Sequence, residues 1–156
     1  MKKHLFLVTA LCVLMICGCQ DEGDKDMEMP EITEEGITAC PVDCEPFVRG
    51  DTIHVHYLFS DNAALGNFNI EIHHNFDHHT HSTSSAECER EENKTPVNPW
   101  VFNQDYAIPA DSKNHETNVC IPIPADIDPG DYHFMIRLTD RAGWQQLKAV
   151  AIKVIE

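Results

Sequence analysis

Apolar residues recur at every second position in several short runs of this sequence, and this period constrains the fold more than any other feature. A period of two places apolar side chains on one face of a β-strand, and no segment after residue 36 repeats them at helical spacing. The expected strands lie within residues 51–59, 68–73, 100–102, 117–123, 132–138 and 147–155. Turn-forming residues such as Pro129-Gly130 separate these runs. We therefore predict an all-β fold, an antiparallel β-sandwich of about seven strands over residues 37–156.

The first nineteen residues have the pattern of a lipoprotein signal. Lys2 and Lys3 precede an apolar run over residues 5–17, which is too short to span a bilayer comfortably. The run ends at Gly18-Cys19, a small residue before Cys that resembles a lipobox. We expect residues 1–18 to be a signal peptide and Cys19 to carry the lipid. The alternative is an ordinary secretory signal that is cleaved nearby.

An acidic segment follows the signal. Residues 20–36 carry eight Asp and Glu against one Lys, so we expect residues 19–36 to form a disordered tether after the lipidated Cys. Acidic residues directly after such a Cys also resemble the surface-export signal of some Gram-negative lipoproteins. The predicted location is therefore the cell envelope, with the lipid in the outer membrane and the domain either surface-exposed or periplasmic.

The net charge of the chain limits the classes of partner that it can bind. The 156 residues contain 26 Asp and Glu but 11 Lys and Arg, a formal net charge of −15. Nucleic-acid binding needs basic side chains to neutralise phosphates, so we expect no nucleic-acid partner. A strongly acidic protein instead attracts cations.

Four cysteines remain after the signal region and the lipidated residue, and an even count in an oxidising compartment predicts disulfides. They are Cys40, Cys44, Cys88 and Cys120. Of the three possible connectivities we favour Cys40–Cys44 with Cys88–Cys120. An alternative is that Cys40-Pro-Val-Asp-Cys44 acts in copper handling, which some Cys-x-x-x-Cys proteins do.

Two motifs give this chain a family resemblance. Residues 130–134 (GDYHF) and 139–143 (TDRAG) look like the F strand and F–G turn of bacterial immunoglobulin-like domains. Together with the string IHHNFDHHTH at 72–81, they resemble the envelope lipoproteins of domain-of-unknown-function family 4625, over roughly residues 45–156 and the lipoprotein start. The resemblance implies an immunoglobulin-like fold and an envelope location. It implies no activity, since none is established for the family.

A histidine cluster is the strongest chemical signal. Five of the nine residues 73–81 are His, and neutral imidazole is a common ligand of zinc, copper and nickel. His79 and His81 form a His-x-His pair, and His73 should face outward because Ile72 faces the core. His133 should also face outward, on a strand beside that of His73. The candidate ligands are therefore His73, His78, His79, His81, His133 and, more weakly, His115.

Several residues near the cluster have alternative interpretations. Asp77 could bind the metal or orient an imidazole, and Phe76 is expected to fill the end of the sandwich. His54 and His56 are interpreted as solvent-facing residues of the opposite sheet. Trp100 and Trp144 are assigned to the core or its rim rather than to a sugar-binding surface.

Three functions compete for this pattern. The preferred one is a non-catalytic lipoprotein that captures or buffers a transition metal ion (zinc, copper or nickel) near an outer-membrane transporter. The second is a copper or zinc metalloenzyme, although the sequence contains no recognised catalytic motif, so we expect no enzyme activity. The third is an adhesion or glycan-binding module with the His-rich loop as its recognition surface. Without a metal, the loop could also be a merely polar, solvated segment or a pH-responsive patch.

Overall fold

The computed structural model describes residues 25–80 and 88–156, and these form strands, turns and loops without a helix. The ten strands are β1 (Glu31–Thr33), β2 (Glu45–Val48), β3 (Thr52–Val55), β4 (Leu58–Ser60), β5 (Leu65–His74), β6 (Phe102–Ala107), β7 (Asn114–Glu116), β8 (Val119–Pro122), β9 (Gly130–Asp140) and β10 (Gln145–Ile155). Within the described part of the chain, no helix is available that could cross a membrane. The expected all-β fold is confirmed.

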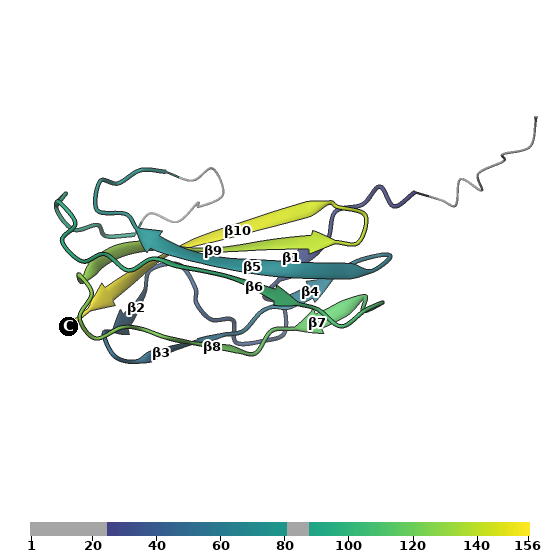
Figure 1. Cartoon of the computed structure of the whole chain (residues 1–156), viewed down its shortest axis with the longest axis horizontal. Coiled ribbons are helices and arrows are strands. Elements are labelled where there is room, and N and C mark those ends of the chain that lie inside the picture. Colours follow the sequence, from purple (N-terminus) through teal and green to yellow (C-terminus); the bar gives the residue numbers. More distant parts are fainter. Residues whose placement is uncertain (1–24, 81–87) are drawn as a thin grey trace, which may run out of the picture.

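The strands form two layers that face each other across the core (Figure 1). One layer is a five-stranded sheet in the order β2-β10-β9-β5-β6, antiparallel except where β2 runs parallel to β10. The other layer contains two small sheets, β3-β8 and β1-β4-β7. The strand predicted over 51–59 is divided into β3 and β4, which belong to different small sheets. Between them, the backbone N–H of Tyr57 donates to the hydroxyl of Thr117 instead of to a carbonyl of a neighbouring strand.

The core lies between the two layers and consists of the residues that the alternation pointed inward. Tyr57 and Phe59 from one layer, with Ile70 and Phe134 from the other, are each at most 1% exposed. The rings of Phe59 and Phe68 meet edge to face at 5.2 Å, which joins the layers directly. Each such buried side chain contributes roughly 1.5–3 kcal/mol of transfer free energy, so this double row accounts for much of the fold's stability.

The expected tether is ordered over part of its length, contrary to the prediction for residues 19–36. Strand β1 pairs with β4 from Glu31 to Thr33, Pro30 is buried, and Ile32 packs against the core. The burial of Pro30, the packing of Ile32, the pairing with β4 and the ion pair between Glu34 and Lys148 together order this acidic segment. The signal peptide, Cys19 and the start of the tether lie outside the described residues.

The predicted disulfide pairing is wrong, since Cys44 bonds Cys88. Cys44 ends a turn that leads into β2, and its N–H bonds the carbonyl of Ala151 on β10, so it belongs to the five-stranded layer. Cys40 instead pairs its backbone with His56 in the other layer. Cys40 and Cys120 are free thiols, and the Cys120 Sγ lies 3.4 Å from the His54 Nδ1.

The two tryptophans occupy the places expected for core and rim. Trp100 is 5% exposed, and its backbone N–H donates to the hydroxyl of Tyr132. It lies in the turn before β6 rather than in the strand predicted at 100–102. Trp144 is 38% exposed in the β9–β10 turn, where its indole N–H donates to the carbonyl of Asp26. Neither forms a free aromatic platform of the kind a sugar would stack on.

Candidate metal centre

Two predicted ligands, His73 and His133, lie directly opposite each other on neighbouring strands. They are register partners in the antiparallel pair β5–β9, so the predicted adjacency of their strands is confirmed. Their chain neighbours Ile72 and Phe134 point into the core, which turns both imidazoles to the outer face of the five-stranded sheet. His133 is nevertheless 3% exposed, because the segment that follows β5 folds back over this face.

A tight turn after β5 brings His79 onto the same face. The N–H of Asn75 bonds the Asp131 carbonyl, and the N–H of His78 bonds the Asn75 carbonyl. His78 has a φ of 58°, a left-handed conformation that reverses the chain. Phe76 anchors the turn, since it is 3% exposed and meets the Tyr132 ring edge to face at 5.3 Å.

The three imidazoles form a compact group. The Nε2 atoms of His73 and His79 are 3.3 Å apart, and their ring centroids are separated by 5.4 Å. The His133 ring lies 5.4 Å from that of His73 and 5.0 Å from that of His79. Two nitrogens bound tetrahedrally to one zinc at ~2.0–2.1 Å are themselves about 3.3–3.4 Å apart, so the His73–His79 spacing matches a shared ion.

In two of the three rings, a carboxylate oxygen lies close to the Nδ1 atom. Asp77 Oδ1 is 2.6 Å from the His79 Nδ1, and Glu71 Oε1 is 3.1 Å from the His73 Nδ1. A carboxylate accepts hydrogen bonds, so Asp77 places the proton of His79 on Nδ1 and leaves the lone pair on Nε2. This same hydrogen bond lowers the pKa of Asp77 below its ordinary value. Asp77 thus orients an imidazole, one of the two roles expected for it.

His133 presents its other nitrogen. Its Nε2 is 3.2 Å from the carbonyl oxygen of His79, which accepts but cannot donate. In the neutral ring the proton is therefore on Nε2 and the lone pair on Nδ1. The lone pair of His133 is thus on Nδ1, whereas that of His79 is on Nε2.

A pocket of about 360 Å³ borders the cluster. Its lining includes His79, Thr80, His133 and the disulfide Cys44–Cys88. The side chain of His79 is 36% exposed, so the cluster is reached from solvent through this pocket.

The family model described as Domain of unknown function (DUF4625) matches residues 17–155. The chain belongs to this family. The match confirms the resemblance to domain-of-unknown-function family 4625, and it includes both the β-sandwich and the Gly18-Cys19 segment. No curated protein matches the chain.

The other predicted ligands of this DUF4625 domain lie outside the group formed by His73, His79 and His133. His78 points to Asp131, with its Nε2 3.8 Å from Oδ2 of that carboxylate. The cluster residue His74, which was not proposed as a ligand, contacts Phe76 instead, with the two rings tilted and their centroids 4.9 Å apart. His81 lies outside the described residues, so its pairing with His79 stays a prediction. Glu71, two residues before His73 on the same strand face, was missed, although that spacing could have indicated it.

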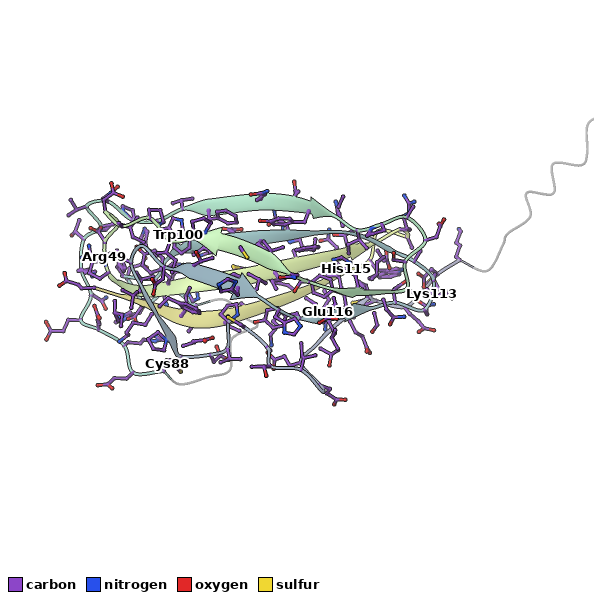
Figure 2. All side chains as sticks on the ribbon, turned by 90° about the horizontal axis from the view of Figure 1, so that it is seen from below. Arg49, Cys88, Trp100, Lys113, His115 and Glu116 are labelled. Carbon is purple, nitrogen blue, oxygen red and sulfur yellow. A yellow bond between two sulfur atoms is a disulfide. The ribbon has the colours of Figure 1, made fainter. Side chains whose placement is uncertain are left out.

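His115 lies in the opposite layer, far from the candidate centre. Strand β7 carries it, and its ring lies 6.1 Å from that of Phe59 and 6.0 Å from that of Phe68. Phe68 projects from the inner face of β5, so His115 borders the core and is separated from His73 by the sheet. Figure 2 shows His115 beside Lys113, away from the labelled Cys88 and Trp100. The weaker candidate is thus not brought to the cluster.

Two histidines of this second layer, His115 and His56, should have pKa values shifted in opposite directions. Burial lowers the pKa of His115, whereas a 2.7 Å hydrogen bond to Glu116 raises the pKa of His56. In NMR titration, we expect the midpoint of His115 below that of an exposed imidazole and the midpoint of His56 above it. Replacing Glu116→Gln should lower the second midpoint and leave the first in place.

These two pKa shifts have opposite effects on how the stability of the fold changes with pH. Near pH 6 the unfolded chain binds more protons at residue 115 than the folded domain does, so this residue makes the fold less stable as the pH falls. His56 has the opposite sign, because its protonated form is favoured in the folded state. A common midpoint for both rings in the folded domain would contradict the contacts described.

Proposed function

We propose that this DUF4625 domain binds a transition metal ion through His73, His79 and His133 and acts in metal capture or buffering. The supporting observation is the 3.3 Å separation of the His73 and His79 Nε2 atoms, with Asp77 hydrogen-bonded to the His79 Nδ1 and a Glu71 oxygen 3.1 Å from the His73 Nδ1. Carboxylate–imidazole–metal arrangements of this kind fix the tautomer and increase the basicity of the ligand. Zinc, copper and nickel all suit an imidazole site, with Cu²⁺ expected to bind most tightly.

Neighbouring contacts favour a ligand site over a solvated loop. A solvated His-rich loop would not need a buried imidazole, yet His133 is 3% exposed and lies under the segment that carries His79. The turn that delivers His79 is anchored by the buried side chains of Asn75 and Phe76. The segment is therefore held in place by packing, and preorganised ligands lose less entropy on binding.

The proposal includes the envelope location and the lipid anchor. The lipobox-like Gly18-Cys19 would place the lipid on Cys19 and hold the domain at the outer membrane. A net charge of −15 raises the local concentration of cations. A tethered acidic domain with an exchangeable metal site is suited to supplying an outer-membrane transporter.

Calorimetric titration of the full chain, purified in mild detergent and treated with chelator, tests metal binding. With ZnCl₂ at neutral pH we expect one ion per chain, with a dissociation constant below ~1 μM, because the Nε2 atoms of His73 and His79 are already 3.3 Å apart and the His133 ring lies beside both rings. Replacing His79→Ala removes a ligand and should weaken binding by more than the ~10–100-fold that loss of an orienting partner costs. Below pH 6 binding should weaken, since the metal competes with protons for the imidazoles.

The matched control is His54→Ala, which removes an exposed histidine from the other layer and should leave zinc affinity unchanged. If affinity falls in His54→Ala and not in His79→Ala, the metal lies between His54 and Cys120 and our assignment is wrong. Millimolar binding by the unaltered chain would also refute it. The His-rich loop would then be a recognition surface for glycans or proteins.

The pocket favours a second candidate, a metalloenzyme. Catalytic metal sites keep a coordination position open to substrate, and the 360 Å³ pocket borders both His79 and His133. The copper-loaded chain distinguishes the two candidates. Sustained redox turnover that is lost in His79→Ala would favour the enzyme, and stoichiometric binding without turnover would favour capture.

A further inference from the structure

Three carboxylates converge at the end of the sandwich opposite the histidine cluster. Asp26 precedes β1, Asp61 follows β4, and Asp140 ends β9. One oxygen from each lies within 4.8 Å of the other two. In Figure 1 this is the end where the N-terminal segment reaches the β9–β10 turn, whereas the segment after β5 lies at the other end. The three residues come from separate parts of the chain, so the fold creates the group.

Each carboxylate uses one oxygen locally and leaves the other without a partner. Oδ1 of Asp140 accepts from the N–H groups of Gly143 and Trp144, Oδ1 of Asp61 accepts from the Ala63 N–H, and Oδ1 of Asp26 accepts from the Asn62 amide. The three Oδ2 atoms are inaccessible to solvent and accept no hydrogen bond from the described residues.

Asp140 gives the strongest indication of a missing ligand. It is 4% exposed, and its Oδ2 is both buried and unpartnered. A buried carboxylate oxygen without a hydrogen bond is destabilising unless a cation satisfies it. Among the described Lys, Arg and His side chains, none forms an ion pair with any of the three aspartates. The three carboxylates thus lie together without an ion-pair partner among the described side chains, and the Lys113 ammonium instead donates to the carbonyl of Asn62.

The spacing and ligand type suit calcium. Ca²⁺ binds carboxylate oxygens at ~2.3–2.6 Å, so two ligands of one ion are separated by at most about 4.6–5.2 Å. The 4.8 Å limit that encloses the three oxygens fits this range. Ca²⁺ also accepts six to eight oxygens in flexible geometry, which water can complete at a partly exposed site. Zinc and copper prefer the imidazoles at the other end of the domain.

We infer that Asp26, Asp61 and Asp140 bind one Ca²⁺ ion, which fastens the N-terminal segment to the β4–β5 and β9–β10 turns. Asp26 already contacts both turns, through the Asn62 amide and through the Trp144 indole N–H that bonds its carbonyl. A bound ion would add a third link at the same place. This inference does not depend on the histidine cluster, so either site can fail without the other.

Calorimetry of the full chain in detergent with CaCl₂ tests the site directly. We expect one Ca²⁺ per chain, with a dissociation constant of about 10⁻⁴–10⁻³ M, as in extracellular modules. Asp140→Asn keeps an oxygen for the turn but removes a charge, and should weaken Ca²⁺ binding at least about 10-fold. Asp61→Asn should act similarly and serves as a second variant if Asp140→Asn does not fold. Asp126→Asn, an exposed aspartate elsewhere, should bind as the unaltered chain does.

Limited proteolysis tests whether the ion fastens the segment. Lys25 is exposed next to Asp26, so a lysine-specific protease should cleave after Lys25 more slowly when Ca²⁺ is present. The protection should be lost in Asp140→Asn and retained in Asp126→Asn. Zinc affinity should be unchanged in Asp140→Asn, and Ca²⁺ affinity should be unchanged in His79→Ala, which separates the two sites.

Two outcomes would overturn the inference. The first is no saturable Ca²⁺ binding up to 10-fold above the expected range of dissociation constants, ~10⁻² M. The second is Ca²⁺ affinity that is equal in the unaltered chain, Asp61→Asn and Asp140→Asn. Binding that leaves cleavage after Lys25 unaffected would refute the fastening of the N-terminal segment.

Discussion

Replacing Phe76→Ala should lower the free energy of unfolding by about 3–5 kcal/mol, the range for removing a buried aromatic ring from a core. Phe76 is 3% exposed, meets the Tyr132 ring at 5.3 Å and has the Lys94 ammonium 4.5 Å above its own ring. Gly130, at a φ of 131°, leaves the space that this ring fills, since a Cβ there would lie 3.0 Å from Phe76 Cε1. Equilibrium denaturation in urea measures the loss.

The same substitution should also weaken zinc binding. Phe76 anchors the turn that carries Asp77 and His79, so a chain without the ring would hold these side chains less firmly. Phe76→Leu should restore most of the stability. Val101→Ala, at a side chain that is 70% exposed, should change it by less than about 0.5 kcal/mol. Equal losses for Phe76→Ala and Val101→Ala would show that the ring does not pack as described.

Removing the Cys44–Cys88 disulfide should lower the free energy of unfolding almost as much as Phe76→Ala does. Cys44 and Cys88 are separated by 44 residues, and the chain-entropy model gives about 4 kcal/mol for closing a loop of that length in the unfolded state. The double replacement Cys44→Ala with Cys88→Ala should reduce the free energy of unfolding by up to that amount, measured in urea without reductant.

Cys120→Ala is the matched control, because this thiol is free and exposed. It should leave stability within about 0.5 kcal/mol of the unaltered chain. Adding reductant should destabilise the unaltered chain and the control but not the double variant. A reductant-sensitive double variant would indicate that Cys40 and Cys120 form the important bond.

The long strands could be predicted because their periodic pattern is local. Residues 132–138 alternate strictly, and β9 contains all of them, as β10 contains 147–155. Strands β1, β2 and β7 were missed because three or four residues carry almost no periodicity, and β1 and β2 also lie in stretches with Pro or acidic residues. Their formation depends on the partner strands β4 and β10, which local sequence does not reveal.

The candidate metal centre was partly predictable for the same reason. Strand parity placed His73 and His133 on the outer face, and the antiparallel order made them neighbours. Parity could not predict that His133 would be covered, because covering depends on the path of the loop after β5. The disulfide and the aspartate group depend on contacts between distant segments. No local spacing marks Asp26, Asp61 and Asp140 as a set.

The pairing of strands β5 and β9 runs along the length of the domain, and we call its two ends the poles of the domain. Leu65 pairs with Asp140 at one end of this ladder, and His73 pairs with His133 at the other. Eight residues of strand span roughly 27 Å. For a chain held at a membrane by its N-terminus, the aspartates would lie at the pole where residue 25 meets the domain. The imidazoles would then lie at the opposite pole, within reach of a soluble donor or of a part of a transporter that protrudes from the membrane.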